Sequence, residues 1–263
     1  MINILITGDY SPQHRVTAAI EKGEWENIFG EVRVLTSQMD YSVTNFESTV
    51  ADVTDIPIRK CGPHLHCTER SLEALQWAGF NMVTLANNHF YDYGDSSVRK
   101  SLKAISLNKF DHVGGGINMA DAKSIFYKEI KQRRFAFINC CEHEFSIATE
   151  KHGGSNPLNP IQQYYQIKEA KENADYCIVI IHGGHEHFQL PSLRMKETYR
   201  FFVDTGADVV VNHHQHCYSG YELYHGSPIV YGLGNFCFDH QGQSPLTWNE
   251  GFALQLQFDA KHI

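Results

Sequence analysis

Carboxylate, carboxamide and imidazole side chains gather in five short segments of this 263-residue chain. Seven of its sixteen histidines lie between residues 182 and 225. Such side chains bind Mn, Fe and Zn at hydrolytic sites, and none of the five segments contains the cysteine that a structural zinc site would favour. The segments are Asp9, Asn45 to Glu47, Asn87 to His89, His182, and His213 to His216.

The spacing within these segments suits shared ligation. Residues two apart on an extended segment point to the same side, so His214 and His216 can face one ion, as can Asn45 and Glu47. A single Asp, Asn or His after a strand is more often a turn or core residue, so the prediction depends on the joint pattern. The ligands suffice for two ions, which lie roughly 3.5–4 Å apart in dinuclear sites.

Each polar segment follows an apolar run typical of a buried strand, and polar side chains at the carboxyl ends of such strands meet in one crevice. Helical patterns lie between these runs. The sequence predicts strands over residues 2–7, 32–35, 42–46, 82–86, 134–139, 177–181 and 208–212, and helices over 17–29, 70–78, 96–107, 159–174 and 191–205. Residues 218–224, 228–233 and 252–258 are expected to form an antiparallel meander.

Repeated strand and helix units with such a tail indicate a layered α/β fold. We expect residues 1–263 to form a single domain, because no linker or internal repeat interrupts the pattern. With 42% hydrophobic and 20% charged residues, the chain can bury a sizeable core, which excludes global disorder.

Charge and hydropathy exclude other classes of protein. The net charge of −8, with no basic block, argues against nucleic acid as a partner. No apolar run approaches the ~18–20 residues of a membrane span, and the first residues do not have the pattern of a signal peptide, so we expect a cytoplasmic protein. The seven scattered cysteines suit reduced thiols. The sequence does not specify an oligomeric state.

Six motifs occur in order along the chain. They are Gly8-Asp9, Asp40 with Asn45-Phe46-Glu47, Leu85 to His89 with Asp92 and Gly94, His182 with Gly184 and Glu186, Gly206-Ala207-Asp208 with His213-His214 and His216, and Ile229 to Asp239. Together they resemble the CapA family of capsule and poly-γ-glutamate synthesis, within the calcineurin-like metallophosphoesterases. The resemblance covers residues 1 to about 240. It implies a four-layer α/β/β/α sandwich with a two-metal site at one edge of the sheets.

The resemblance also implies roles for individual residues. The expected metal ligands are Asp9 and His216 for a first ion, Asn45 or Glu47 at the bridging position, and Asn88, His182 and His214 for a second ion. His89 is the expected catalytic residue, with Asp92 orienting its ring. Glu186, His185, His213 and Asn235 are expected to contact the substrate.

The chain departs from the superfamily pattern at the first strand. An Asp-x-His motif is usual there, but Asp9 is followed by Tyr10-Ser11, and His14 could replace the missing ligand only if its loop folds back. Occupancy by one ion and by two ions both stay open. Near the last histidines, Asn212 and Gln215 replace the family's usual Gly and Pro.

Two classes of function fit this sequence. The first is metal-dependent hydrolysis of a small-molecule or envelope-polymer-related phosphoester. The second is a non-catalytic component of capsule or poly-γ-glutamate synthesis that binds polymer or a partner, because a fold does not fix a function. The segment from Cys61 to Cys67, with His64 and His66, fits an active-site loop better than a zinc cluster.

Overall fold

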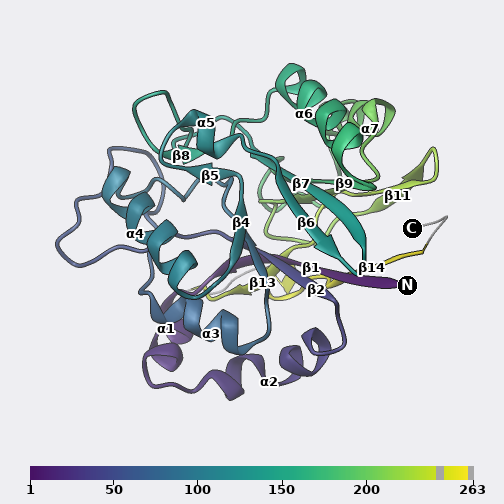
Figure 1. Cartoon of the computed structure of the whole chain (residues 1–263). Coiled ribbons are helices and arrows are strands. Elements are labelled where there is room, and N and C mark those ends of the chain that lie inside the picture. Colours follow the sequence, from purple (N-terminus) through teal and green to yellow (C-terminus); the bar gives the residue numbers. More distant parts are fainter. Residues whose placement is uncertain (241–245, 260–263) are drawn as a thin grey trace.

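The computed structural model describes residues 1–240 and 246–259 of the chain. Two β-sheets pack face to face, and helices cover the outer face of each sheet (Figure 1). This arrangement confirms the four-layer α/β/β/α sandwich that the resemblance implied.

The first sheet has the order β13-β1-β2-β3-β4, with β14 paired to the start of β1. Neighbouring strands along this path run parallel, whereas β14 is antiparallel to β1. Its strands are β1 (Ile2–Ser11), β2 (Tyr41–Phe46), β3 (Met82–Thr84), β4 (Asp111–Val113), β13 (Asn235–Phe238) and β14 (Leu254–Phe258).

The second sheet has the order β11-β12-β10-β9-β7-β6, with parallel pairing from β12 to β7 and an antiparallel strand at each edge. Its strands are β6 (Phe126–Ile130), β7 (Arg133–Cys141), β9 (Tyr176–His182), β10 (Val209–His213), β11 (Tyr221–Tyr224) and β12 (Ser227–Val230). A third, two-stranded sheet joins β5 (Gly115–Gly116) to β8 (Gly154–Ser155).

Helices α1 to α4 pack on the outer face of the first sheet, and α6 and α7 pack on that of the second. The ends of the last two have clear local causes. Asn159 caps α6 ahead of a proline in the first turn, Ser192 caps α7, and Gly206 ends α7 at a φ of 127°. The helices are α1 (His14–Glu21), α2 (Trp25–Thr36), α3 (Arg70–Trp77), α4 (Gly94–Leu107), α5 (Met119–Ala122), α6 (Pro160–Asn173), α7 (Leu193–Thr205) and the 3₁₀ helix η1 (Leu246–Asn249).

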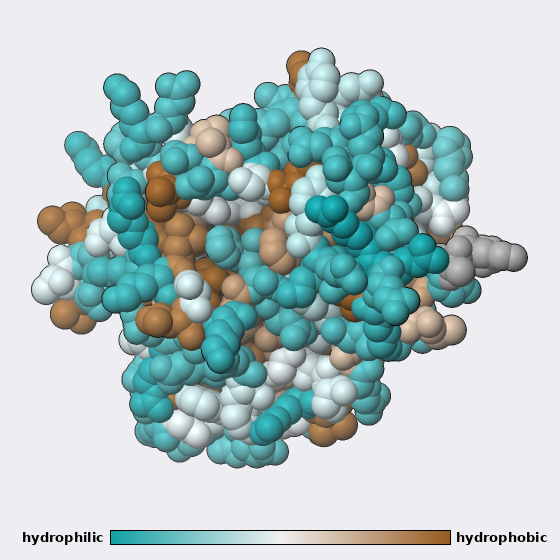
Figure 2. Space-filling view, viewed as in Figure 1, coloured by the Kyte–Doolittle hydropathy of each residue, from teal (hydrophilic) through white to brown (hydrophobic). Residues whose placement is uncertain are grey.

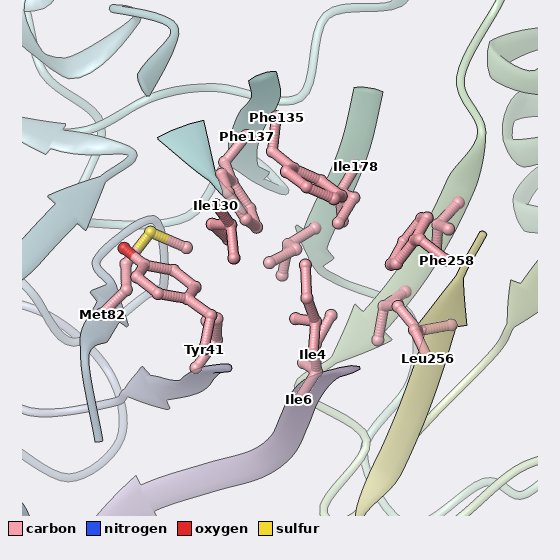
Figure 3. Packing of buried hydrophobic residues seen from close by; sticks show 14 of the residues in the cluster. Ile4, Ile6, Tyr41, Met82, Ile130, Phe135, Phe137, Ile178, Leu256 and Phe258 are labelled. Carbon is pink, nitrogen blue, oxygen red and sulfur yellow. The ribbon is translucent and has the colours of Figure 1, made fainter. Parts of the chain in front are cut away.

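Alternate residues of the central strands fill two different cores. On β9, Ile178 and Ile180 face the first sheet, whereas Val179 and Ile181 pack under the helices. Figure 3 shows the core between the sheets, where Ile4, Ile6, Tyr41 and Met82 lie opposite Ile130, Phe135, Phe137 and Ile178. Burial on both faces explains why these strands are apolar throughout rather than alternating with polar residues.

Two local predictions were wrong. Residues 32–35 belong to helix α2, because Phe29 and Thr36 are buried on one side of a continuous amphipathic helix. The predicted helix over 17–29 is divided between α1 and α2, which are separated at Gly23 with a φ of 75°. Short segments rich in β-branched residues are ambiguous between helix and strand when only local spacing is read.

The tail does not form one antiparallel meander. Strands β11 and β12 make a hairpin in the second sheet, but β13 and β14 cross to the first sheet and both pair with β1. Strand β13 delivers Asn235 opposite Asp9 in parallel register. The tail therefore connects the two sheets.

Hydrophilic residues predominate on the face shown in Figure 2, with hydrophobic residues in small groups between them. Within residues 1–240 and 246–259, no helix is long and apolar enough to cross a membrane.

The join between β1 and β13 requires a glycine at residue 8. A Cβ atom on Gly8 would lie 1.9 Å from the carbonyl oxygen of Gly234, which accepts a hydrogen bond from the Asp9 amide at 3.1 Å. The two backbones approach so closely that no side chain fits between them.

We predict that Gly8→Ala lowers the free energy of unfolding by about 2 kcal/mol or more, because overpacking a rigid backbone contact forces the strands apart. Urea denaturation measures this change. Gly220→Ala is the matched control, since a Cβ there meets nothing within 4 Å, and its effect should stay within about 0.5 kcal/mol. Equal stability of the Gly8→Ala and Gly220→Ala variants would contradict the close approach.

Candidate metal centre

The predicted polar segments converge at the carboxyl ends of strands from both sheets. Asp9 lies opposite Asn45 in the β1–β2 pairing, and His182 lies opposite His213 in the β9–β10 pairing. The remaining polar segments lie in the turns that follow β2, β3 and β10. Parallel strands that end at one edge bring these residues together even though Asp9 and His214 lie 205 positions apart in the sequence.

One group of ligand atoms surrounds a point between the two sheets. Nε2 of His182 lies 3.0 Å from Oδ1 of Asn88, 3.1 Å from Nδ1 of His214 and 3.6 Å from Oε1 of Glu47. Adjacent ligands of an octahedral ion with bonds of about 2.1 Å lie about 3 Å apart. The spacing of these four side chains therefore fits one divalent ion.

A second group shares Glu47 with the first. Nε2 of His216 lies 3.6 Å from Oε1 of Glu47, and Nδ1 of His216 lies 3.4 Å from Oδ2 of Asp9. Asn235 Oδ1 lies 2.9 Å from the same Nδ1, where it can accept its proton and leave Nε2 free to bind an ion. The side chains of Asp9, Glu47 and His216 all lie close enough to hold one cation.

Glu47 gives the strongest evidence that these groups are suited to cations. Its side chain is fully buried, and neither carboxylate oxygen has a hydrogen-bond partner among the residues that the structure describes. Burial raises the pKa of Glu47 well above its usual range, and the charges of Asp9, Glu186 and Glu144 raise it further. A buried carboxylate without donors is costly unless a positive ion compensates it, so the residues present fit a metal.

The electrostatics of Asp9 are different. Burial alone would raise the pKa of Asp9, but the hydrogen bond with His216 and the charges of His213, His182 and His216 reverse the effect and lower it. The amide of His214 also donates to Asp9 Oδ2 at 3.2 Å. Asp9 is therefore held as a carboxylate, the state in which it can bind a cation.

Two of the expected site residues lie behind the ligands. Asn45 donates from Nδ2 to Asp9 Oδ1 at 2.7 Å and lies 3.1 Å from His182 Nδ1, while its oxygen accepts from Thr84. His213, which was expected at the substrate, is buried with Nε2 3.0 Å from the Thr7 carbonyl oxygen. These placements suit residues that orient the ligands rather than residues that bind an ion or a substrate.

The turn that follows β10 is strained at both ligands. His214 and His216 have φ angles of 92° and 50°, a backbone region that residues other than glycine seldom adopt. Asn212 donates to the Gly183 carbonyl at 2.8 Å and contacts Gln215. The two residues that depart from the family pattern therefore contact each other and hold this turn in place.

Beside the ligands lies a pocket of about 390 Å³. His89 and Glu186 line it, together with His14 and His187, whereas His185 is exposed to solvent. None of the ligand groups found among the described residues includes His14, so no substitute for the missing histidine of Asp-x-His is evident in that part of the chain. The group of Asp9, Glu47 and His216 therefore lacks the histidine that the Asp-x-His motif would supply.

His89 and Asp92 form a pair at the pocket. Nδ1 of His89 lies 2.7 Å from Oδ2 of Asp92, and Nε2 lies 3.9 Å from Glu47. Burial lowers the pKa of His89, although the hydrogen bond with Asp92 works against this. An ionised Asp92 places a proton on Nδ1 and so leaves Nε2 facing the ligands.

Sequence reasoning missed Lys60 and Glu144. Lys60 pairs with Asp92, and Glu144 Oε1 lies 3.7 Å from Nε2 of His214. Neither residue belongs to a motif or follows a predicted strand, so only the folded loops reveal them. Cys61 lines the pocket on the loop that contains Lys60, so the segment from Cys61 to Cys67 begins beside the candidate site.

Comparison with known proteins decides the family. The sequence model of the family described as "Bacterial capsule synthesis protein PGA_cap" matches residues 3–240. The chain belongs to this family. The matched residues include every proposed ligand of both groups and the His89–Asp92 pair.

Curated relatives of this PGA_cap chain include two Bacillus proteins. It is 32% identical over 246 residues to the capsule biosynthesis protein CapA of Bacillus anthracis, covering 90% of this chain and 60% of that protein. It is 30% identical over 243 residues to the PGA biosynthesis protein CapA of Bacillus subtilis, covering 91% and 64%. The chain thus spans less than two thirds of the length of these relatives.

Solved structures of similar fold include phosphatases and nucleotidases. A phosphatase from Mycoplasma pneumoniae superposes on this PGA_cap chain with a TM-score of 0.54 at 18% identity, over 89% of this chain and 72% of that one. A putative 5'-nucleotidase from Staphylococcus aureus gives 0.55 at 14% identity, over 89% and 48%. These similarities show the metallophosphoesterase fold.

We predict that Glu47→Gln removes most of the thermal stabilisation that Mn²⁺ gives to the wild-type chain, because Glu47 faces both ligand groups. A ligand at one hundred times its Kd stabilises a protein by about 2.7 kcal/mol. Without metal, the variant should be at least as stable as wild type, since an unpaired buried carboxylate is gone.

Thermal unfolding with and without Mn²⁺ measures both effects. Glu129→Gln changes an exposed carboxylate on β6 and serves as the control. An equal Mn²⁺-induced shift in Glu47→Gln and wild type would show that the ions bind elsewhere.

Proposed function

We propose that this chain is a divalent-metal-dependent phosphoester hydrolase with a dinuclear centre. The observation that carries the proposal is the buried, unpartnered carboxylate of Glu47 between two groups of ligands, beside a pocket that His89 lines. Mn, Fe or Zn ions bound there would act as Lewis acids toward a phosphoryl group.

The proposed metal ligands are Asp9, Glu47 and His216 for one ion and Glu47, Asn88, His182 and His214 for the other, with Asn45 supporting Asp9 and His182. His89 directs Nε2 toward the same region, where its doubly protonated imidazolium form would give the Nε2 proton to the departing oxygen of the ester and keep the Nδ1 proton on Asp92. Asp92 holds the imidazole by Nδ1. Glu186 lines the pocket and would contact the substrate. Asn235 contacts His216 Nδ1 and would act on the reaction through that ligand.

The substrate class that we propose is a small-molecule phosphoester or one related to an envelope polymer. The support is the naming of the Bacillus relatives for capsule and PGA biosynthesis, together with the phosphatase and nucleotidase structures that share the fold. The acidic net charge of −8 gives no support to a nucleic-acid partner.

A second candidate is a non-catalytic component of polymer synthesis. The observation that favours it is the short ligand set around Asp9, where buried Ser11 occupies the position of the usual histidine. A Mycobacterium tuberculosis relative, 22% identical, is described as a probable polyglutamine synthesis accessory protein. Fewer than one ion per chain after Mn²⁺ loading would favour this candidate over hydrolysis.

We predict Mn²⁺-dependent hydrolysis of p-nitrophenyl phosphate by the wild-type chain. His89→Ala should lower kcat by about 10²-fold or more on an alkyl ester such as glycerol phosphate and by much less on p-nitrophenyl phosphate, since general acid catalysis contributes typically 10²–10⁴-fold where the leaving oxygen needs a proton. The content of bound Mn²⁺ should not change, because His89 lies outside both ligand groups.

The release of p-nitrophenol or of phosphate from glycerol phosphate, and the metal content of the same samples, are the measurements. His225→Ala removes an imidazole from the distant β11–β12 turn and should keep full activity. The proposal would be overturned if protein that holds two ions per chain hydrolysed none of the esters in a broad phosphoester panel.

A further inference from the structure

A buried ammonium group lies beside the His89–Asp92 pair, where Lys60 is one of the residues that line the pocket. The side chain of Lys60 is 2% exposed, its Nζ forms an ion pair with Oδ1 of the fully buried Asp92, and Nζ lies 3.2 Å from His89 Nδ1. The Phe145 ring covers the ammonium, with Nζ 5.7 Å from its centroid. A lysine is seldom buried unless it is paired, so this one has a specific role in the fold or at the site.

Asp92 is also the point at which the loop over residues 58–66 is attached. The Ile58 amide donates to the Asp92 carbonyl at 2.9 Å, and the Leu65 amide donates to Asp92 Oδ2 at 2.7 Å. Lys60 adds the third contact, to Oδ1. Between these attachments the loop places Cys61 against the metal pocket.

Resting on the proposed hydrolase function, we propose that Lys60 is a positioning residue that fixes Asp92, and through it His89, for protonation of the leaving group. Its ion pair occupies Oδ1 of Asp92 and so directs Oδ2 at His89 Nδ1. The same contact holds the 58–66 loop across the pocket. The working unit is therefore a chain of three side chains, Lys60, Asp92 and His89.

Burial makes this arrangement rigid. Within the described residues, the contacts to Oδ1 come from Lys60 alone, and without that charge Asp92 would be a buried carboxylate lacking compensation on one oxygen. Breaking such a pair by removing one partner is strongly destabilising, whereas removing both partners can be nearly neutral. The carboxylate would turn or move to find another donor, and His89 would lose its fixed orientation.

The kinetic test compares two esters of different leaving group, p-nitrophenyl phosphate and an alkyl phosphate such as glycerol phosphate. An alkoxide leaving group is a much stronger base than p-nitrophenolate, so its departure depends far more on protonation by a general acid. We expect Lys60→Met to lower kcat for the alkyl ester about tenfold more than for the aryl ester, with KM little changed, since general acid catalysis supplies 10²–10⁴-fold.

Lys60→Arg should recover most of the loss, because it keeps the charge beside Asp92. Arg59→Met removes an equal charge from the exposed neighbouring residue and should leave both rates unchanged. If Lys60→Met folds poorly, the double variant Lys60→Met, Asp92→Asn removes both charges and should show the same selective loss for the alkyl ester. An equal loss for both esters in a folded variant would overturn the positioning role.

A second readout does not require turnover. Cys61 is exposed, whereas Cys67, Cys140, Cys141, Cys177 and Cys217 are buried, so a fluorescent maleimide should label Cys61 first, with Cys61→Ser as the labelling control. Anisotropy of the label should fall in Lys60→Met and stay at the wild-type value in Arg59→Met, because Lys60 adds the side-chain contact to Asp92 directly beside Cys61.

The two readouts separate the two proposals. A wild-type chain with no hydrolysis on any ester, but a looser loop in Lys60→Met, would refute the hydrolase function and keep the anchoring by Lys60. Unchanged anisotropy in Lys60→Met would overturn the anchoring, whatever the activity.

Discussion

The proposed chemistry depends on one buried carboxylate that no hydrogen-bond donor reaches within the described residues. Glu47 lies where the two sheets bring their polar residues together, and burial together with nearby acidic groups raises its pKa. Most buried carboxylates are paired with a donor or a cation, because desolvation of an isolated charge costs several kcal/mol. Histidines on either side of Glu47, spaced about as metal ligands are, give this residue a physical reason to be there.

The rest of the fold keeps those ligands in place. Parallel strands of two sheets end at one edge, Gly8 allows β13 to approach β1, and a strained turn presents His214 and His216. Amides and carbonyl groups around the ligands then orient them, as Asn235 does for His216. Such supporting contacts commonly change metal affinity by 10–100-fold when they are removed. The strands therefore set the positions of the ligands, and the hydrogen-bonding residues around them set their orientation.

Much of this could be predicted from the sequence, because strand ends carry local signals. The apolar run before His182 and the pair His214 and His216 were enough to suggest ligands at one edge of a sheet. The helix over 32–35 was missed, because its burial depends on the sheet beneath it. The roles of Lys60 and Asn212 were also invisible, since their partners lie 32 and 29 residues away in loops of no regular pattern.

A crystal structure grown with Mn²⁺, with anomalous scattering measured near the metal edge, tests the central claim most directly. We predict two anomalous peaks, one on each side of the Glu47 carboxylate, the first against Asp9 and His216 and the second against Asn88, His182 and His214. A well-ordered Glu47 that pairs with a protein donor, and shows no anomalous peak beside it, would contradict the account.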